Sequence, residues 1–175
     1  MSSKIASRLR FRPPWHPGIP VPDPEAYAGG TVLLASEGRK ISPQAVALAA
    51  RLARRAGAEV HVLSIARIWG SALGLPHPGL KPNKHELQAQ HDLVAEAVAG
   101  LKRKGVAADG QIIGTRSAAK RIVGEARRRG AGAIVMSADP PKHWLLADMM
   151  WSQEPYRVRR LAEVPVYTVV DGSRD

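Results

Sequence analysis

Polar side chains follow two buried apolar runs, at places where a ligand could be held. Ser36 and Glu37 come directly after the run 31–35, and Ser137 follows the run 133–136. The ligand crevice of an open parallel sheet lies at the carboxyl ends of its strands, so these residues are candidates for lining one. Glu37 is the best single candidate for an acid, although the sequence shows no partner for it.

A second polar group lies at the predicted start of a helix. Gly114, Thr115, Arg116 and Ser117 would offer free backbone amides, two hydroxyls and a guanidinium, which together could hold an anion. The alternative is an ordinary helix cap in which the Ser117 side chain accepts a backbone hydrogen bond. We favour the cap, because it explains the serine without any ligand.

The sequence contains no recognisable catalytic or metal-binding constellation. It has no cysteine, which excludes disulfides, thiolate zinc sites and cysteine nucleophiles. His85 and His91 lie six positions apart, the wrong spacing for one metal ion on one helix face. His61 alternates with valines on a predicted strand and is interpreted as structural. The common hydrolase, zinc-protease and Walker motifs are missing as well, so we expect neither an enzyme nor a metal site.

The chain that positions these residues alternates between apolar runs and amphipathic segments. In a chain of 175 residues this alternation predicts one α/β domain with a doubly wound, five-stranded parallel sheet covered by helices on both faces. Ser42 and Pro43 predict the start of the first helix, and Gly57 predicts its end. The expected strands cover residues 31–35, 59–65, 107–113, 133–136 and 165–170, and the expected helices cover residues 42–56, 84–104, 117–129 and 156–161.

The net charge of +11 raises the question of an anionic partner. Arginines close two of the predicted helices, at 54–55 and 127–129, where they complement the helix dipole without any ligand. We therefore do not expect nucleic-acid binding, but keep a basic, nucleic-acid-binding accessory protein as an alternative.

No apolar run approaches the length of about 20 residues that spans a bilayer, and the N-terminus lacks a secretory signal. A cytoplasmic location without membrane contact is expected.

Two segments stand apart from the α/β pattern. Residues 1–28 form a basic, proline-rich arm in front of the predicted domain 29–172, with Phe11, Trp15 and Tyr27 as possible anchors. We favour partial anchoring over a free tail, because a tail gains nothing from exposed aromatic side chains. Residues 140–153 are rich in large apolar side chains, including Trp144 and Trp151, and are expected to fold inward over the crevice.

Four ordered segments carry a likeness to a known family. They are a first strand that ends in Ser36-Glu37-Gly38 and is followed by Ser42; a small-residue helix that enters the second strand, 45–62; the strand Gly132-Ala-Ile-Val-Met136; and the closing helix and strand start, 157–166. In this order they resemble the universal stress protein family, over most of the chain beyond the arm. The resemblance implies a Rossmann-like three-layer sandwich of the adenine nucleotide alpha hydrolase type, and a homodimer formed through the C-terminal strand Pro165–Val170.

The family's nucleotide site can be carried over only in part. Its strand-one aspartate, which contacts the sugar, corresponds to Glu37. Its glycine-rich phosphate loop is missing, because Pro140 and Pro141 lack amide hydrogens and there is no glycine between Gly132 and Gly172. Ser137 and Ser152 are further apart than the glycines they would replace. The candidate ligand-binding residues are Ser36, Glu37, Ile65, Gly114, Thr115, Arg116, Met136, Ser137, Ser152 and Gln153.

This sequence therefore resembles the family members that do not bind ATP. We expect a stress-response or signalling module that acts by binding a protein partner, with a degenerate nucleotide site, no cofactor and no turnover. ATP or AMP binding is disfavoured. The alternative is an adenine-nucleotide-binding member with a rebuilt phosphate loop.

Overall fold

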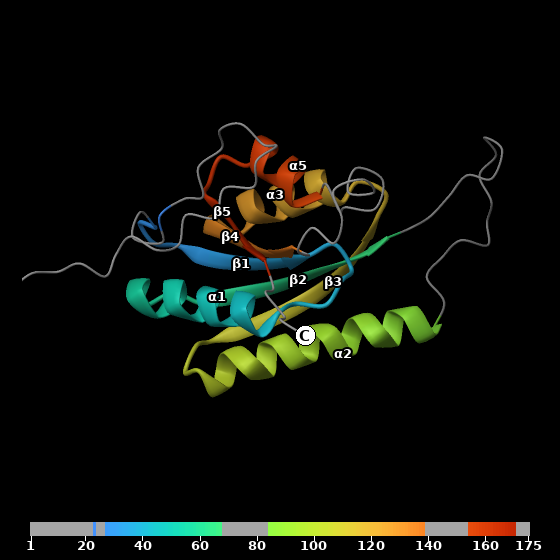
Figure 1. Ribbon diagram of the computed structural model, residues 1–175, viewed down its shortest axis with the longest axis horizontal. Coiled ribbons are helices and arrows are strands. Elements are labelled where there is room, and N and C mark those ends of the chain that lie inside the picture. Colours follow the sequence, from blue (N-terminus) through green and yellow to red (C-terminus); the bar gives the residue numbers. More distant parts are fainter. Residues whose placement is uncertain (1–22, 24–26, 68–83, 139–153, 171–175) are drawn as a thin grey trace, which may run out of the picture.

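The computed structural model describes residues 23, 27–67, 84–138 and 154–170. These residues form one parallel sheet of five strands in the order β3-β2-β1-β4-β5, with helices on both faces (Figure 1). The strands are β1 (Thr31–Ser36), β2 (Val60–Arg67), β3 (Ala108–Thr115), β4 (Ala131–Ala138) and β5 (Val166–Val170). The predicted doubly wound α/β fold is confirmed.

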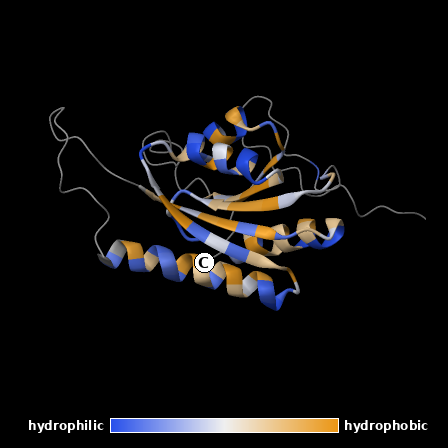
Figure 2. Cartoon of the chain, turned by 180° about the vertical axis from the view of Figure 1, so that it is seen from behind, coloured by the Kyte–Doolittle hydropathy of each residue, from blue (hydrophilic) through white to orange (hydrophobic). Residues whose placement is uncertain are grey.

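Four helices in the described part of the chain make up the two outer layers. On one face lie α1 (Pro43–Ala56) and α2 (Lys84–Arg103), and on the other lie α3 (Ala118–Arg128) and α5 (Glu154–Leu161). The buried side chains of α1 are all apolar and those of α3 are apolar except Glu125, and the strands between the two helix layers are largely hydrophobic (Figure 2). This arrangement is the three-layer sandwich that alternating strands and helices produce.

Successive strand residues belong to two different cores. Val32 and Leu34 of β1 pack under α1 and α2, whereas Leu33 and Ala35 pack under α3 and α5. All four are almost fully buried. Because both faces of the sheet are covered, the strand is an unbroken apolar run rather than an alternating one.

The predicted ends of α1 are confirmed. Ser42 Oγ accepts a hydrogen bond from the Ala45 amide at 3.2 Å, and Pro43 is the first helical residue. Gly57 closes the helix with φ of 60°, a conformation that favours glycine. Local sequence signals are sufficient here because every partner lies within one turn.

The arm is anchored at its end nearest the sheet. Tyr27 is buried in the α1–α2 core, and its hydroxyl donates to the Gly30 carbonyl. The Tyr167 hydroxyl of β5 donates to the Asp23 carbonyl at 3.1 Å. The expected anchoring role is therefore observed for Tyr27, while Phe11 and Trp15 lie outside the described residues.

An ionic cluster around the buried Glu125 and His61 lies between the start of β2 and the end of α3. Glu125 is buried and accepts hydrogen bonds from Arg128, Arg129 and Gln111. His61 is also buried; its Nδ1 lies 2.5 Å from Asp109 Oδ1 and its Nε2 lies 4.0 Å from Glu125 Oε1. His61 thus has a structural position, as its place on the strand predicted.

Candidate functional site: the crevice between β1 and β4

The crevice lies at the point where the order of the strands in the sheet reverses. After β1 the chain adds β2 and β3 on one side, and it then returns to add β4 and β5 on the other side. The carboxyl ends of β1 and β4 are therefore neighbours, with Ala35 paired to Met136. Ligands of open α/β sheets bind at such a switch point.

Glu37 is held by an arginine of the same turn. Both Nε and Nη2 of Arg39 donate to Glu37 Oε1, at 2.8 and 2.6 Å. The Glu37 side chain is only 3% exposed, whereas that of Arg39 is 34% exposed. These charge-assisted hydrogen bonds hold the Glu37 carboxylate against the guanidinium of Arg39.

Two serine side chains, those of Ser36 and Ser137, also line the crevice. The Ser36 hydroxyl accepts a hydrogen bond from the Gly38 amide at 3.1 Å and donates to the Arg39 carbonyl. The Ser137 hydroxyl of β4 accepts from the Ser42 amide at 2.9 Å. The space that Ser36, Glu37 and Ser137 line, together with Arg39 and Lys40, is about 60 Å³. Pockets for drug-sized ligands measure roughly 300–1,000 Å³, so this cavity is well below that range.

A helix residue fastens the turn after β1. The amide of Gln90 on α2 donates to the Gly38 carbonyl at 3.0 Å, and its oxygen accepts from the Ser64 hydroxyl of β2. Gly38 has φ of 101°, and a Cβ there would lie 2.8 Å from the Ile65 carbonyl oxygen. Sequence reasoning missed both Gln90 and Arg39. The available signal was that Gln90 is a polar residue one turn before Val94, on the side of α2 that faces the sheet.

The structure brings together only some of the predicted site residues. Ser36, Glu37 and Ser137 share the crevice. The side chains of Ile65 and Met136 are fully buried in the α3–α5 core, so only their backbone could reach a ligand. Ser152 and Gln153, like the apolar segment 140–153, lie outside the described residues.

Gly114, Thr115 and Arg116 lie away from this crevice. They end or follow β3, which is an edge strand separated from β1 by β2. Ser117 is the N-cap residue of α3, as predicted, but the capping hydrogen bond expected of its side chain is not formed. The Ala119 amide instead donates to Glu154 Oε2 of α5, at 3.1 Å. A carboxylate from a neighbouring helix serves α3 better than a local hydroxyl, since it also complements the helix dipole.

Within the described ranges, no group of three histidine or acidic side chains is arranged to hold a metal ion. No described helix is long and apolar enough to cross a membrane.

The geometry of the sheet and its crevice can be compared with known proteins. The model of the universal stress protein family matches residues 30–169. The chain belongs to the universal stress protein family. A search of curated proteins finds no match.

Solved structures of the family share the fold at low sequence identity. A universal stress protein from Archaeoglobus fulgidus has 17% identity and a TM-score of 0.63, over 80% of this chain and 93% of that chain. The structure of the Archaeoglobus fulgidus protein in complex with dAMP has 17% identity and a TM-score of 0.59, over 82% and 98%. A protein of the family from Burkholderia pseudomallei has 22% identity and a TM-score of 0.56, over 80% and 95%.

Proposed function

We propose that this universal stress protein is a binding module that acts through a protein partner rather than by turnover, with a nucleotide crevice closed by its own side chains. The observation that carries the proposal is the pairing of the buried Glu37 with Arg39 beside a cavity of about 60 Å³. A nucleotide in this crevice would have to displace Arg39 and widen the cavity. Hydrogen bonds to charged groups contribute about 1.5–3 kcal/mol each, so this rearrangement would cost a large part of the binding free energy.

The first prediction concerns ATP. Calorimetric titration of the full chain with ATP and Mg²⁺ should give a dissociation constant weaker than roughly 10 μM, about −7 kcal/mol. The physical reason is that Arg39 and the serine hydroxyls already satisfy the polar groups that a nucleotide would use. A tighter dissociation constant would contradict the proposal.

The variant Arg39→Ala separates the two readings of this arginine. If Arg39 closes the crevice, its removal cannot weaken ATP binding, and the variant should bind as well as or better than the natural chain. If Arg39 were instead a phosphate ligand of a rebuilt site, the variant should bind about tenfold more weakly. Arg51→Ala, an exposed arginine on α1, is the matched control and should leave ATP binding unchanged.

The second candidate is an adenine-nucleotide-binding member with a rebuilt phosphate loop. Its supporting observation is the structural similarity to the Archaeoglobus fulgidus protein in complex with dAMP. Tight ATP binding that falls on replacement of Arg39 would establish this candidate and exclude the first.

The second prediction is a homodimer through β5. In the described sheet β5 is an edge strand, and its exposed backbone groups can pair with another chain. The Ile134 amide donates to the Pro165 carbonyl at 3.0 Å. Because successive residues of a strand direct their backbone groups to opposite sides, Pro165 and Tyr167 face β4, and the Thr168 amide faces the free edge.

Thr168→Pro should therefore remove an edge amide without disturbing the β4–β5 ladder, and should convert the dimer into a monomer in light scattering. Thr168→Val keeps the amide and should remain a dimer. If the natural chain is already a monomer at micromolar concentration, dimerisation through β5 is wrong, and the N-terminal arm becomes the better candidate to cover this edge.

A further inference from the structure

A second hollow lies between α3 and α5, the two helices that cover one face of the sheet. It measures about 340 Å³, which lies within the size range of ligand pockets. We call it the α3–α5 groove. Its walls carry the side chains of Arg116 and Lys120 on one side and of Arg157, Arg160 and Leu161 on the other, above Ala119. It does not include Ser36, Glu37 or Ser137 of the β1–β4 crevice.

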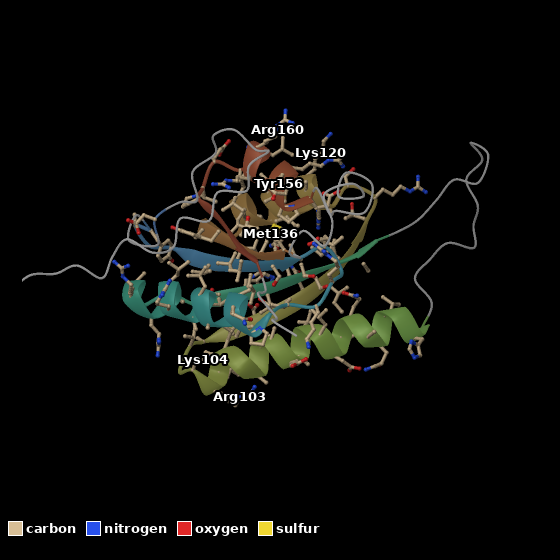
Figure 3. All side chains as sticks on the ribbon, viewed as in Figure 1. Arg103, Lys104, Lys120, Met136, Tyr156 and Arg160 are labelled. Carbon is tan, nitrogen blue, oxygen red and sulfur yellow. The ribbon has the colours of Figure 1, made fainter. Side chains whose placement is uncertain are left out.

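The groove has an excess of positive charge. Residues 116–129 and 154–163 contain nine arginines and lysines but three glutamates. Each of the three glutamates is already paired with an arginine of the same layer, as Glu125 with Arg128, Glu154 with Arg157 and Glu163 with Arg127. In the described part of the chain, Arg116, Lys120 and Arg160 have no acidic partner. Lys120 and Arg160 project from this layer away from the sheet (Figure 3).

The groove also has an apolar component. Leu161 is 46% exposed, one of two large hydrophobic side chains exposed among the described residues. It lies beside the buried Ala118 and Ala119, which form the floor. Phosphate backbones gain nothing from an exposed leucine, and none of the described residues that line the groove is aromatic and able to stack on a base. The combination of an apolar floor and a cationic rim fits an amphipathic acidic segment better than a nucleic acid.

One carboxylate already occupies the wall of the groove. Glu154 Oε2 accepts the Ala119 amide at 3.1 Å, and Glu154 Oε1 lies 3.3 Å from Arg157 Nη1. The carboxylate is thus held by a helix amide and a guanidinium together. A second carboxylate, supplied by a partner, would meet Arg116, Lys120 and Arg160 across the same hollow.

We propose that the α3–α5 groove is a docking site for an acidic peptide segment of a partner protein. A leucine-like side chain of the peptide would pack on Ala118, Ala119 and Leu161, and carboxylates of the peptide would pair with Arg116, Lys120 and Arg160. This inference rests on the proposed role as a binding module, and it places the partner surface away from the nucleotide crevice. Complementary charge steers the encounter and sets specificity, while the apolar contact supplies affinity.

The test uses a short fluorescein-labelled peptide of aspartate, glutamate and leucine, titrated with the full chain and followed by fluorescence anisotropy. The double variant Lys120→Glu/Arg160→Glu should bind at least about tenfold more weakly than the natural chain. The double variant Arg51→Glu/Arg54→Glu changes the net charge equally, but on the helix that covers the opposite face of the sheet. It should bind the peptide within about twofold of the natural chain. Circular dichroism melting of both variants checks that they are folded.

Two further probes distinguish the kinds of partner. A peptide with serine in place of each leucine should bind about tenfold more weakly, because it keeps the charges but loses the anchor. A duplex DNA should bind both double variants with the same reduced affinity, since non-specific phosphate binding follows the overall charge.

Three results would overturn the inference. They are equal loss of peptide binding in the two double variants, equal binding of the serine peptide, and DNA binding that only the groove variant loses. The absence of any peptide binding by the natural chain would overturn it as well. None of these measurements involves nucleotide. Tight ATP binding would therefore refute the proposed closed crevice without changing what the peptide titrations say about the α3–α5 groove.

Discussion

Replacing Glu125 with glutamine should lower the free energy of unfolding by about 2–3 kcal/mol near neutral pH, because it removes a buried charge that several donors share. The hydrogen bond from Arg128, joined by those from Arg129 and Gln111, lowers the pKa of Glu125 from 4.5 to about 2. Chemical denaturation of both chains measures the difference. The matched control is Glu163→Gln, which breaks an Arg–Glu pair of 2.6 Å whose side chains are 58% and 72% exposed. An exposed pair contributes about 0–1 kcal/mol, so this control should change stability little.

The effect should also depend on pH in one direction. A carboxyl group whose pKa is lower in the folded state stabilises the fold above its ordinary pKa and loses this contribution as the pH falls. The difference between the natural chain and Glu125→Gln should therefore be full above pH 4.5 and should shrink as the pH approaches about 2. A difference that is constant over this range would mean that the Glu125 charge does not contribute.

Gly132→Ala should destabilise the protein by about 3 kcal/mol or more, as overpacking of a filled site does. A Cβ at Gly132 would lie 1.7 Å from the Gly29 carbonyl oxygen and 3.1 Å from the Tyr27 ring. The first neighbour is backbone, so a side-chain rotation cannot relieve the overlap. Thermal and denaturant unfolding of the variant measure the loss.

The control for this prediction is a glycine with free space around it. Gly124 lies in α3, and a Cβ there would meet nothing within 4 Å. Gly124→Ala should stabilise the chain by about 0.5–1 kcal/mol, since alanine favours the helix. If Gly132→Ala were as well tolerated as Gly124→Ala, the segment around Tyr27 and Gly29 would not pack against β4 as its contacts indicate.

The sequence by itself was sufficient for the fold and for the family. Unbroken apolar runs such as 31–35 predict strands that are covered on both faces, and the structure places β1 in the middle of the sheet. Ser42, Pro43 and Gly57 predict the ends of α1, and both ends are confirmed. The position of β5 at the edge also follows from the order of elements. These features depend on neighbours within one helical turn or on strand periodicity, which a sequence displays directly.

The sequence located the crevice but not its contents. Ser36, Glu37 and Ser137 meet there as their places at strand ends predicted. The tertiary structure decided that Arg39 would pair with Glu37, that Gln90 would join Ser64 to Gly38, and that Arg116 would lie in a different groove.

The replacement of the Ser117 cap by Glu154 was decided in the same way. Ala119, whose amide Glu154 accepts, is 35 positions from Glu154 in the sequence, and no local pattern relates the two residues. They meet because α3 and α5 pack side by side on one face of the sheet. Periodicity determines which side of a helix is buried, whereas the packing of whole elements determines which charged side chains come within hydrogen-bonding distance.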